Sequence, residues 1–132
     1  MRRLARDETG TGLVPMIGGF VVFLALLTFA VQLCLNLYAT TAVTGAAYDA
    51  AHIVAGSEAG GEESARLEAE AHARQVLGRL GEQTRFEWTV DGDDVALRVQ
   101  AVNPRVVLPA LGAQLGFDTV DRTVRVRREV LR

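Results

Sequence analysis

The residues in this sequence that could carry out chemistry include two pairs of an acid and a histidine at helical spacing. Asp49 and His52 are three residues apart, and Glu68 and His72 are four apart, so each pair would share one face of a helix. A zinc site would need a third and a fourth ligand, and none is spaced to supply them. Because neighbouring acids and histidines on helices are usually solvated, we expect neither pair to bind a metal.

A third candidate is the acidic stretch Asp-Gly-Asp-Asp at residues 91–94, which superficially suggests a calcium loop. It lacks the ordered ligands and the closing glutamate of that motif, so a hairpin turn explains it better. There is no glycine-rich phosphate loop, and neither Ser57 nor Ser64 lies in a nucleophile-elbow pattern. The formal net charge of −2 gives no electrostatic reason to bind nucleic acid. We therefore expect a protein that is not an enzyme, uses no cofactor and binds no nucleic acid.

The element that must position everything else is an apolar run at residues 13–38. It lies within a longer window, residues 9–48, that contains no charged side chain. A helix rises about 1.5 Å per residue, so roughly twenty apolar residues cross the hydrocarbon layer of a membrane, which is about 30 Å thick. The run exceeds that length and predicts a single membrane-spanning helix.

The arginines around this run predict its orientation. Arg2, Arg3 and Arg6 precede it, and the next arginine in the chain is Arg66. Positive residues are retained on the cytoplasmic side, so we expect the N-terminus in the cytoplasm and the C-terminal part outside. The expected location is the cytoplasmic (inner) membrane, which the chain would cross once.

A cleaved signal peptide is the alternative interpretation of the same run. The small residues at 40–42 resemble a cleavage site, and cleavage there would release a secreted binding domain that begins near Val43. However, the run is about twice as long as the usual apolar region of about 7 to 15 residues. Asp7 and Glu8 also lie in a region that is normally only basic. Both features favour an uncleaved span.

Small and polar residues along the run predict where the helix packs against other helices. Thr28, Gln32 and Asn36 recur every four residues, so they share one side, where another protein would accommodate them better than lipid. The alanines after the span form a narrow stripe that fits either a neighbouring copy or the chain's own sheet. The expected packing positions are Gly18, Gly19, Thr28, Gln32, Asn36, Ala39, Ala42 and Ala46.

Beyond the span, the apolar residues keep a helical spacing over two segments. The first helix continues to about Ala55 and stops at Gly56. After a polar linker at residues 57–63, a second helix is expected at residues 64–80, with Gly81 at its end. Its apolar face would contain Ala69, Ala73, Val76, Leu77 and Leu80.

The spacing then changes to the alternation that is typical of strands. Two strands would flank a turn at residues 91–93, and a third would occupy residues 120–131. The apolar connection at residues 106–117 would contain one short helix after Pro109. A three-stranded antiparallel sheet packed on the long helix would bury the apolar face of the strands. That face would contain Phe86, Trp88, Val90, Val95, Leu97, Val99, Ala101, Val124, Val126 and Val130.

The predicted fold class is therefore α+β, with three parts: a cytoplasmic leader at residues 1–12, a membrane-spanning and extended helix at 13–56, and a small extracytoplasmic α+β domain at 57–132. This plan resembles a type IV pilin-like subunit. Residues 6–10, Arg-Asp-Glu-Thr-Gly, resemble the Arg-Asp-x-x-Gly leader of TadE-like minor pseudopilins of the Tad (Flp) pilus system. Residues 42–55 look like the alanine-rich segment of those proteins, and residues 122–129 are similar to their alternating Arg/Val C-terminus.

The resemblance implies a structural minor pilin or assembly factor of a Tad-type (type IVc) pilus. A prepilin peptidase would cut after Gly10 and leave Thr11 as the first mature residue. The family usually has a glutamate five residues after the cut, where this chain has Pro15. The implied partners are the lipid bilayer, other pilus or pseudopilin subunits and assembly-platform proteins. The alternative is an unprocessed membrane-anchored adaptor that is unrelated to pili.

The last candidate site is a basic cluster formed by Arg122, Arg125, Arg127 and Arg128. Such a cluster could bind an acidic partner or phosphates. Charged edge strands are also a common protection against unwanted strand pairing, and we favour that interpretation.

Overall fold

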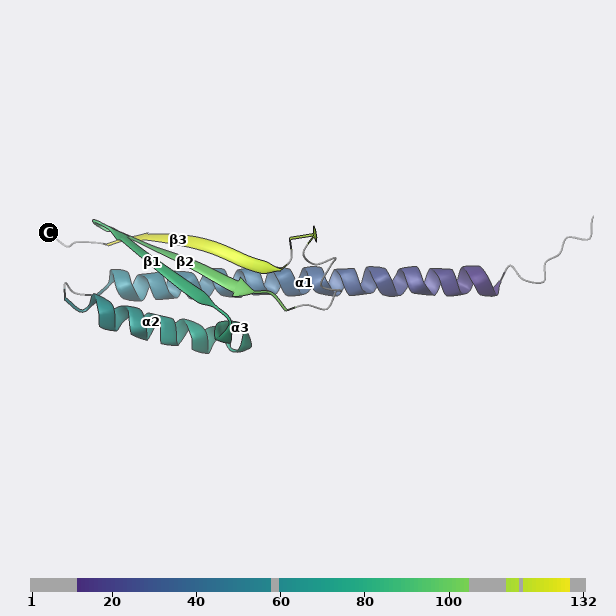
Figure 1. Ribbon diagram of the computed structural model, residues 1–132, viewed down its shortest axis with the longest axis horizontal. Helices are drawn as coiled ribbons and strands as arrows, with labels where there is room; N and C mark the ends of the chain where they lie inside the picture. Colours follow the sequence, from purple (N-terminus) through teal and green to yellow (C-terminus); the bar gives the residue numbers. More distant parts are fainter. Residues whose placement is uncertain (1–11, 58–59, 105–113, 117, 129–132) are drawn as a thin grey trace, which may run out of the picture.

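A computed structural model describes residues 12–57, 60–104, 114–116 and 118–128. Within these residues the chain has an α+β fold, in which a long N-terminal helix is followed by two further helices and a three-stranded antiparallel sheet (Figure 1). The elements are α1 (Leu13–Ala55), α2 (Glu62–Leu77), α3 (Arg79–Glu82), β1 (Arg85–Asp91), β2 (Asp94–Val102) and β3 (Thr119–Arg127).

Helix α1 is one continuous helix of 43 residues, about 65 Å long at 1.5 Å per residue. It begins at Leu13, so Pro15 lies in the first turn, where the missing N–H costs little. It ends at Ala55, where the N–H of Gly56 donates to the carbonyl oxygen of His52 at 2.9 Å. The prediction of one helix that ends at about Ala55 is confirmed.

Helix α2 differs from its predicted bounds at both ends. It begins at Glu62, inside the predicted linker, and it ends at Leu77, with Gly78 rather than Gly81 as the capping residue. The backbone of Gly78 has a φ of +56°, a conformation that favours glycine. Gly81 instead lies buried in α3, where an added Cβ would come within 2.5 Å of the carbonyl oxygen of Arg74. The expected apolar face is also corrected at one position, because Val76 is 56% exposed.

The sheet has the order β1-β2-β3, and both pairs of strands are antiparallel. The β1–β2 hairpin turns at Gly92 and Asp93, and Gly92 has a φ of +59°. The predicted hairpin and its alternation are confirmed. The last strand ends at Arg127, and Val130 lies outside the described residues, as does most of the predicted connection at 106–117.

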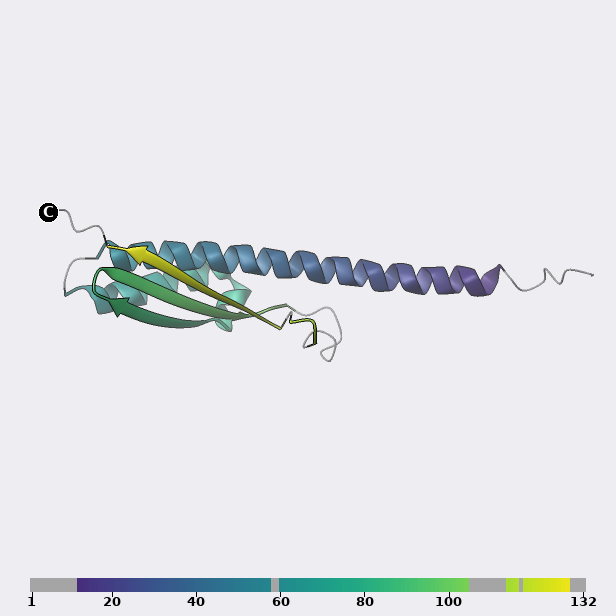
Figure 2. The same ribbon diagram turned by 90° about the horizontal axis from the view of Figure 1, so that it is seen from above.

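The helices and the sheet form two layers. Strands β2 and β3 pack on the C-terminal half of α1, and α2 lies beside that half of the helix (Figures 1 and 2). A bond from the indole nitrogen of Trp88 to Glu70 Oε1, at 2.8 Å, joins β1 to α2. The core combines small side chains of α1 and α2 with β-branched residues and leucine of the sheet. Its fully buried members include Ala39, Val43, Ala47, Ala50, Ala51, Val54, Ala69, Ala73, Val95, Leu97 and Val99.

Candidate functional site

Helix α1 is divided at Gln32 into an uncovered and a covered part. Every residue from 13 to 31 is exposed except Thr28, which is half-buried. These 19 residues extend about 28 Å, close to the thickness of the hydrocarbon layer of a membrane. The most apolar 18-residue window of α1 has a mean hydropathy of 2.4, and none of it is buried. The helix is long and apolar enough to cross a membrane; a signal sequence near the N-terminus would have the same properties.

Gln32 marks the boundary because its side chain binds the chain's own small domain. It is only 2% exposed, and its Nε2 donates to the carbonyl oxygen of Pro104, just after β2, at 3.1 Å. The sequence predicted that this amide would meet another protein. Thr28 is likewise satisfied within the chain, because its hydroxyl donates to the carbonyl oxygen of Leu24 at 2.8 Å. Asn36 is half-buried and lines a groove with Thr40 and the first residues of β3.

The small residues proposed for helix packing fall into two groups. Ala39 and Ala46 are buried in the core, so they pack against the chain's own sheet and α2, and Ala42 lies at the margin of that core. Gly18 and Gly19 lie in the uncovered part, and an added Cβ at either would meet no atom within 4 Å. Gly10 and Thr11 lie outside the described residues.

A second surface of α1 was not predicted from the sequence. We call it the outer face, and it consists of Leu37, Tyr38, Thr41, Gly45 and Tyr48. Tyr38 is 68% exposed, Leu37 and Tyr48 are also exposed, and the space beside Gly45 is open. These residues recur three or four apart on the side opposite the buried alanines, which is the signal that could have revealed them. The outer face thus extends the apolar surface of residues 13–31 beyond Gln32.

The solvent-facing side of the sheet is polar, and its shortest ion pair among the described residues joins Arg98 to Asp121. The guanidinium of Arg98 binds Asp121 with an Nη2–Oδ2 distance of 2.6 Å, and Gln100 Nε2 donates to the same oxygen at 3.2 Å. Hydrogen bonds from Arg98 and then Gln100 lower the pKa of Asp121, and the same bond to Asp121 raises the pKa of Arg98. Both groups are solvent-exposed, so the pair positions side chains more than it stabilises the fold.

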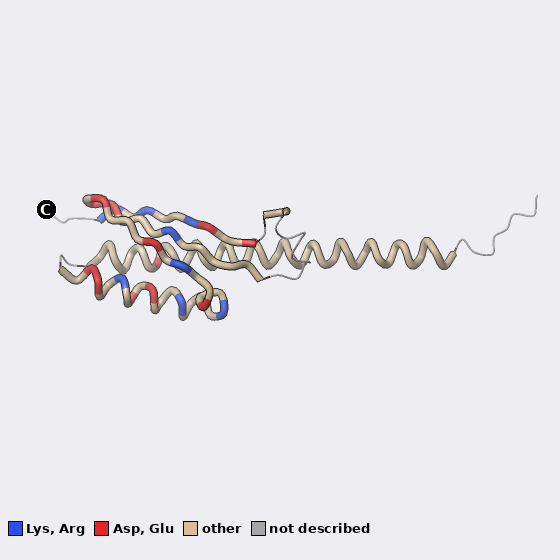
Figure 3. The backbone as a smooth tube through the Cα atoms, viewed as in Figure 1, with Lys and Arg blue, Asp and Glu red and all other residues tan. Residues whose placement is uncertain are grey.

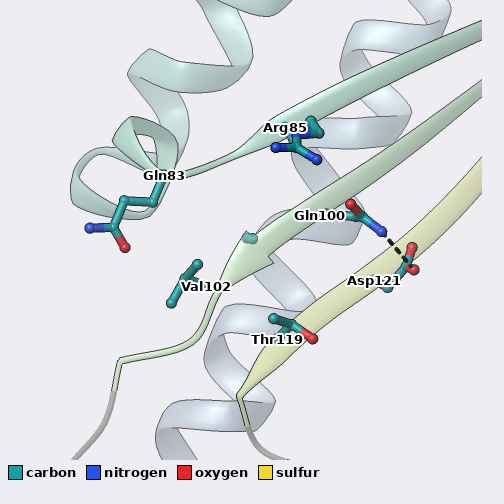
Figure 4. A pocket seen from close by; sticks show the side chains of 7 residues that line it. Gln83, Arg85, Gln100, Val102, Thr119 and Asp121 are labelled. Carbon is teal, nitrogen blue, oxygen red and sulfur yellow. Dashed lines mark hydrogen bonds between the residues drawn. The ribbon is translucent and has the colours of Figure 1, made fainter.

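A shallow depression of about 240 Å³ lies at one end of this polar side (Figure 4). Arg85 from β1 and Asp121 from β3 lie on either side of Gln100 from β2, and Gln83, Ala101, Val102 and Thr119 complete the lining.

The remaining candidates from the sequence lie on exposed parts of two helices and at a turn. Asp49 and His52 are exposed on α1, and Glu68 and His72 are exposed on α2. In the described part of the chain, no three or more histidine, cysteine or acidic side chains are grouped to hold a metal ion. Residues 91–94 form the β1–β2 turn and the first residue of β2.

The basic cluster is divided between two environments. Arg122, Arg125 and Arg127 are exposed on β3, which is an edge strand of the sheet. Arg128 is half-buried and forms an ion pair with Glu62 at the start of α2. Glu62 also lies 3.8 Å from Arg66, so this end of the cluster ties the sheet to α2.

Comparison of the chain with protein-family models, with curated proteins and with solved structures finds no match. The arrangement of the helices and the sheet is nevertheless distinctive. A long apolar N-terminal helix is half uncovered, and a small three-stranded antiparallel sheet packs on its other half. The chain has a pilin-like architecture.

Proposed function

We propose that this chain is a structural, non-enzymatic subunit of a Tad-type pilus, either a TadE-like minor pilin or an assembly factor. In this proposal, residues 13–31 cross the cytoplasmic membrane, the N-terminus lies in the cytoplasm and the small domain lies outside. The observation that carries the proposal is the abrupt change in cover at Gln32, which leaves about one bilayer thickness of apolar helix without protein around it.

The large apolar side chains of the uncovered part are energetically costly to leave in water. Thirteen of them between Leu13 and Val31 are more than 40% exposed. Burial of such a side chain is worth about 1.5 to 3 kcal/mol when complete. Even about 1 kcal/mol for each would match the roughly 5 to 15 kcal/mol that stabilises a whole domain. Contact with lipid, or with the apolar helices of other subunits, would remove the free-energy cost of exposing these side chains to water.

The outer face supplies the surface for association with other pilin-like subunits. It is continuous with the membrane segment, so a neighbouring helix could contact both without interruption. Gly45 and Thr41 allow close approach there, and Tyr38 and Tyr48 supply apolar area with a polar end. Assembly-platform proteins would meet the same surface, and a prepilin peptidase would act at Gly10. Because residue 15 is proline, association would proceed without the charged pair that a glutamate there would form.

The secreted alternative is disfavoured by where its cleavage site lies. A signal peptidase cut after Ala42 would separate Ala39 from Val43, and both are fully buried in the same core. The cut would also remove the bond between Gln32 and Pro104. An unprocessed adaptor would keep the same anchor but would retain residues 1–10 and have different partners.

The test is the intact mass of the native protein together with its behaviour in membrane fractionation. The proposal expects a product that stays with the membrane after alkaline extraction, lacks Met1 to Gly10 and co-purifies with pilus subunits. A full-length membrane-bound product without pilus subunits would instead establish the adaptor. A soluble product that begins near Val43 would overturn the membrane anchor itself.

A further inference from the structure

The two edges of the sheet carry opposite charges in matching rows. In the strand register, Arg85 of β1, Gln100 of β2 and Asp121 of β3 form one row across the sheet. Six rows further along, Asp91 of β1 and Arg127 of β3 lie at the two ends of another row, with Asp94 between them. Directly paired residues share a face of the sheet, so all of these side chains lie on its solvent-facing side. At each end of this side, one edge is basic where the other is acidic.

Both edges are available for contact. Among the described residues, no strand pairs with the outer edge of β1 or of β3. Arg85, Asp91, Arg125 and Arg127 are exposed, and the side chain of Arg127 is 82% exposed. Figure 3 shows the acidic turn between β1 and β2 beside the basic residues of β3. The β3 edge therefore exposes positive charge at Arg125 and Arg127, and the turn end of β1 exposes negative charge at Asp91.

We propose that copies of this chain associate side by side, with the β1 edge of one copy against the β3 edge of the next. This inference rests on the proposed membrane anchor, because shared insertion fixes all copies in the same orientation and at similar height. In that arrangement β1 and β3 of neighbouring copies run parallel. Asp91 of one copy then meets Arg127 of the next, and Arg85 meets Asp121. The occupant of each edge is thus a second copy of this chain.

The charge pattern also disfavours the commonest alternative, a two-fold dimer. A two-fold axis along the membrane normal would place identical residues of the two copies at the same height. Two β3 edges would then oppose Arg125 to Arg125 and Arg127 to Arg127, and two β1 edges would oppose Asp91 to Asp91. Only the β1-to-β3 contact brings opposite charges together. Such a head-to-tail contact produces rings or open rows of copies rather than closed pairs.

Charges already present around these groups limit how strongly the edges attract. Asp121 is bound by Arg98 and Gln100, and Arg127 lies 3.8 Å from Asp94 of its own chain. Both remain exposed enough to face a second partner. Exposed ion pairs are individually weak, so association would depend on confinement of the copies in one membrane.

Cross-linking of two tagged copies in membrane vesicles from cells that express both tests this arrangement. One full-length copy carries Thr89→Cys on β1, the other carries Thr123→Cys on β3, and both carry Cys34→Ala. These threonines lie on the solvent-facing edges, and their replacement leaves every charge in place. A short bismaleimide should link the 89–123 pair several times faster than the 89–89 or 123–123 pairs. A cysteine at Ala96, on the central strand, gives the background rate.

Charge reversal then identifies the contact. Asp91→Arg in the first copy or Arg127→Asp in the second should each slow 89–123 cross-linking by about two- to fivefold, the range of an exposed ion pair. Both reversals together should restore the rate, and Glu68→Arg on α2 should leave it unchanged. Equal rates for the 89–89, 123–123 and 89–123 pairs, or no restoration, would overturn the arrangement. Alkaline extraction of the same vesicles separates this failure from a failure of the anchor, since copies that resist extraction yet do not cross-link contradict only the edge contact.

Discussion

The two halves of α1 form one continuous helix but have different surroundings, because the first half is uncovered and the second packs against the sheet and α2. Residues 13–31 carry large apolar side chains all around the helix, and nearly all of them are exposed. Residues 32–55 bury mostly small side chains on one side and expose a mixture of aliphatic, aromatic and polar residues on the other. The difference shows that side-chain size and distribution, rather than backbone structure, decide whether a helical segment meets lipid or a sheet.

The largest expected effect is the loss of membrane insertion when a charge is placed in the uncovered half. Leu24→Arg would place a guanidinium near the middle of residues 13–31, at a cost of about 2.5 to 3.5 kcal/mol for membrane insertion. Tyr48→Arg makes the matched change on the exposed side of the covered half and should leave insertion intact. Alkaline extraction of membranes measures both. Equal retention of the two variants would contradict the division of α1 at Gln32.

The same enlargement in each half should have unequal effects on stability. Ala50 is fully buried, so Ala50→Leu would overpack the core and destabilise the domain by about 1 to 3 kcal/mol. Ala25 is exposed in the uncovered half, so Ala25→Leu should change the free energy of unfolding little. Urea unfolding in detergent, followed by the fluorescence of Trp88, compares them. Similar losses from both variants would show that the uncovered half also packs against protein.

The contact between α1 and the small domain can be weakened at Gln32. Gln32→Leu keeps a side chain of similar size but removes the donor to Pro104, so the domain should lose about 0.5 to 1.5 kcal/mol of stability. Insertion should be unaffected, because the change makes the helix more apolar. Thr28→Val is the control, since its hydroxyl bonds only within α1 among the contacts described. Unfolding measurements that rank the control as the more damaging change would refute a special role for the boundary amide.

A substitution on the outer face should change stability and assembly in opposite directions, with a smaller effect on stability than the changes above. Gly45 lies within α1 with open space beside it, so Gly45→Ala should stabilise the helix by about 0.5 to 1 kcal/mol. If neighbouring helices approach the outer face closely, the same methyl group should reduce co-purification with pilus subunits. A variant that is more stable and assembles normally would exclude close packing at Gly45.

The smallest expected effect concerns the polar side of the sheet, far from the uncovered half. The pKa of Asp121 is lowered below its ordinary value of 3.8, so its contribution to stability is present above that value and is lost as the pH falls through the lowered pKa. Asp121→Asn should therefore lower the free energy of unfolding slightly at neutral pH and hardly at all below the lowered pKa of Asp121, so that the variant loses less stability as the pH falls. Unfolding curves at pH 3 and pH 7 for both proteins test this, and parallel pH dependence would contradict it.

Much of the fold follows from local patterns. The period of two from Arg85 to Ala101 identified the hairpin, because alternation alone decides which strand residues face a core. The end of α2 was not found, because Gly78 and Gly81 are both plausible end signals. The choice between them depends on the close approach of α3 to Arg74, which involves packing rather than local sequence.

The sequence by itself determined that α1 is long and apolar, that an α+β domain follows it, and that the last strand carries exposed arginines. These features depend on residue type and period, which act over a few neighbouring residues. The tertiary structure alone decided where protein cover of α1 begins, which side of α1 remains free, and which charges lie in one row of the sheet. Those outcomes join residues far apart in the chain. Packing of the small domain on α1 brings Gln32 to Pro104, and the pairing of β2 with both other strands places Asp91 and Arg127 in one row.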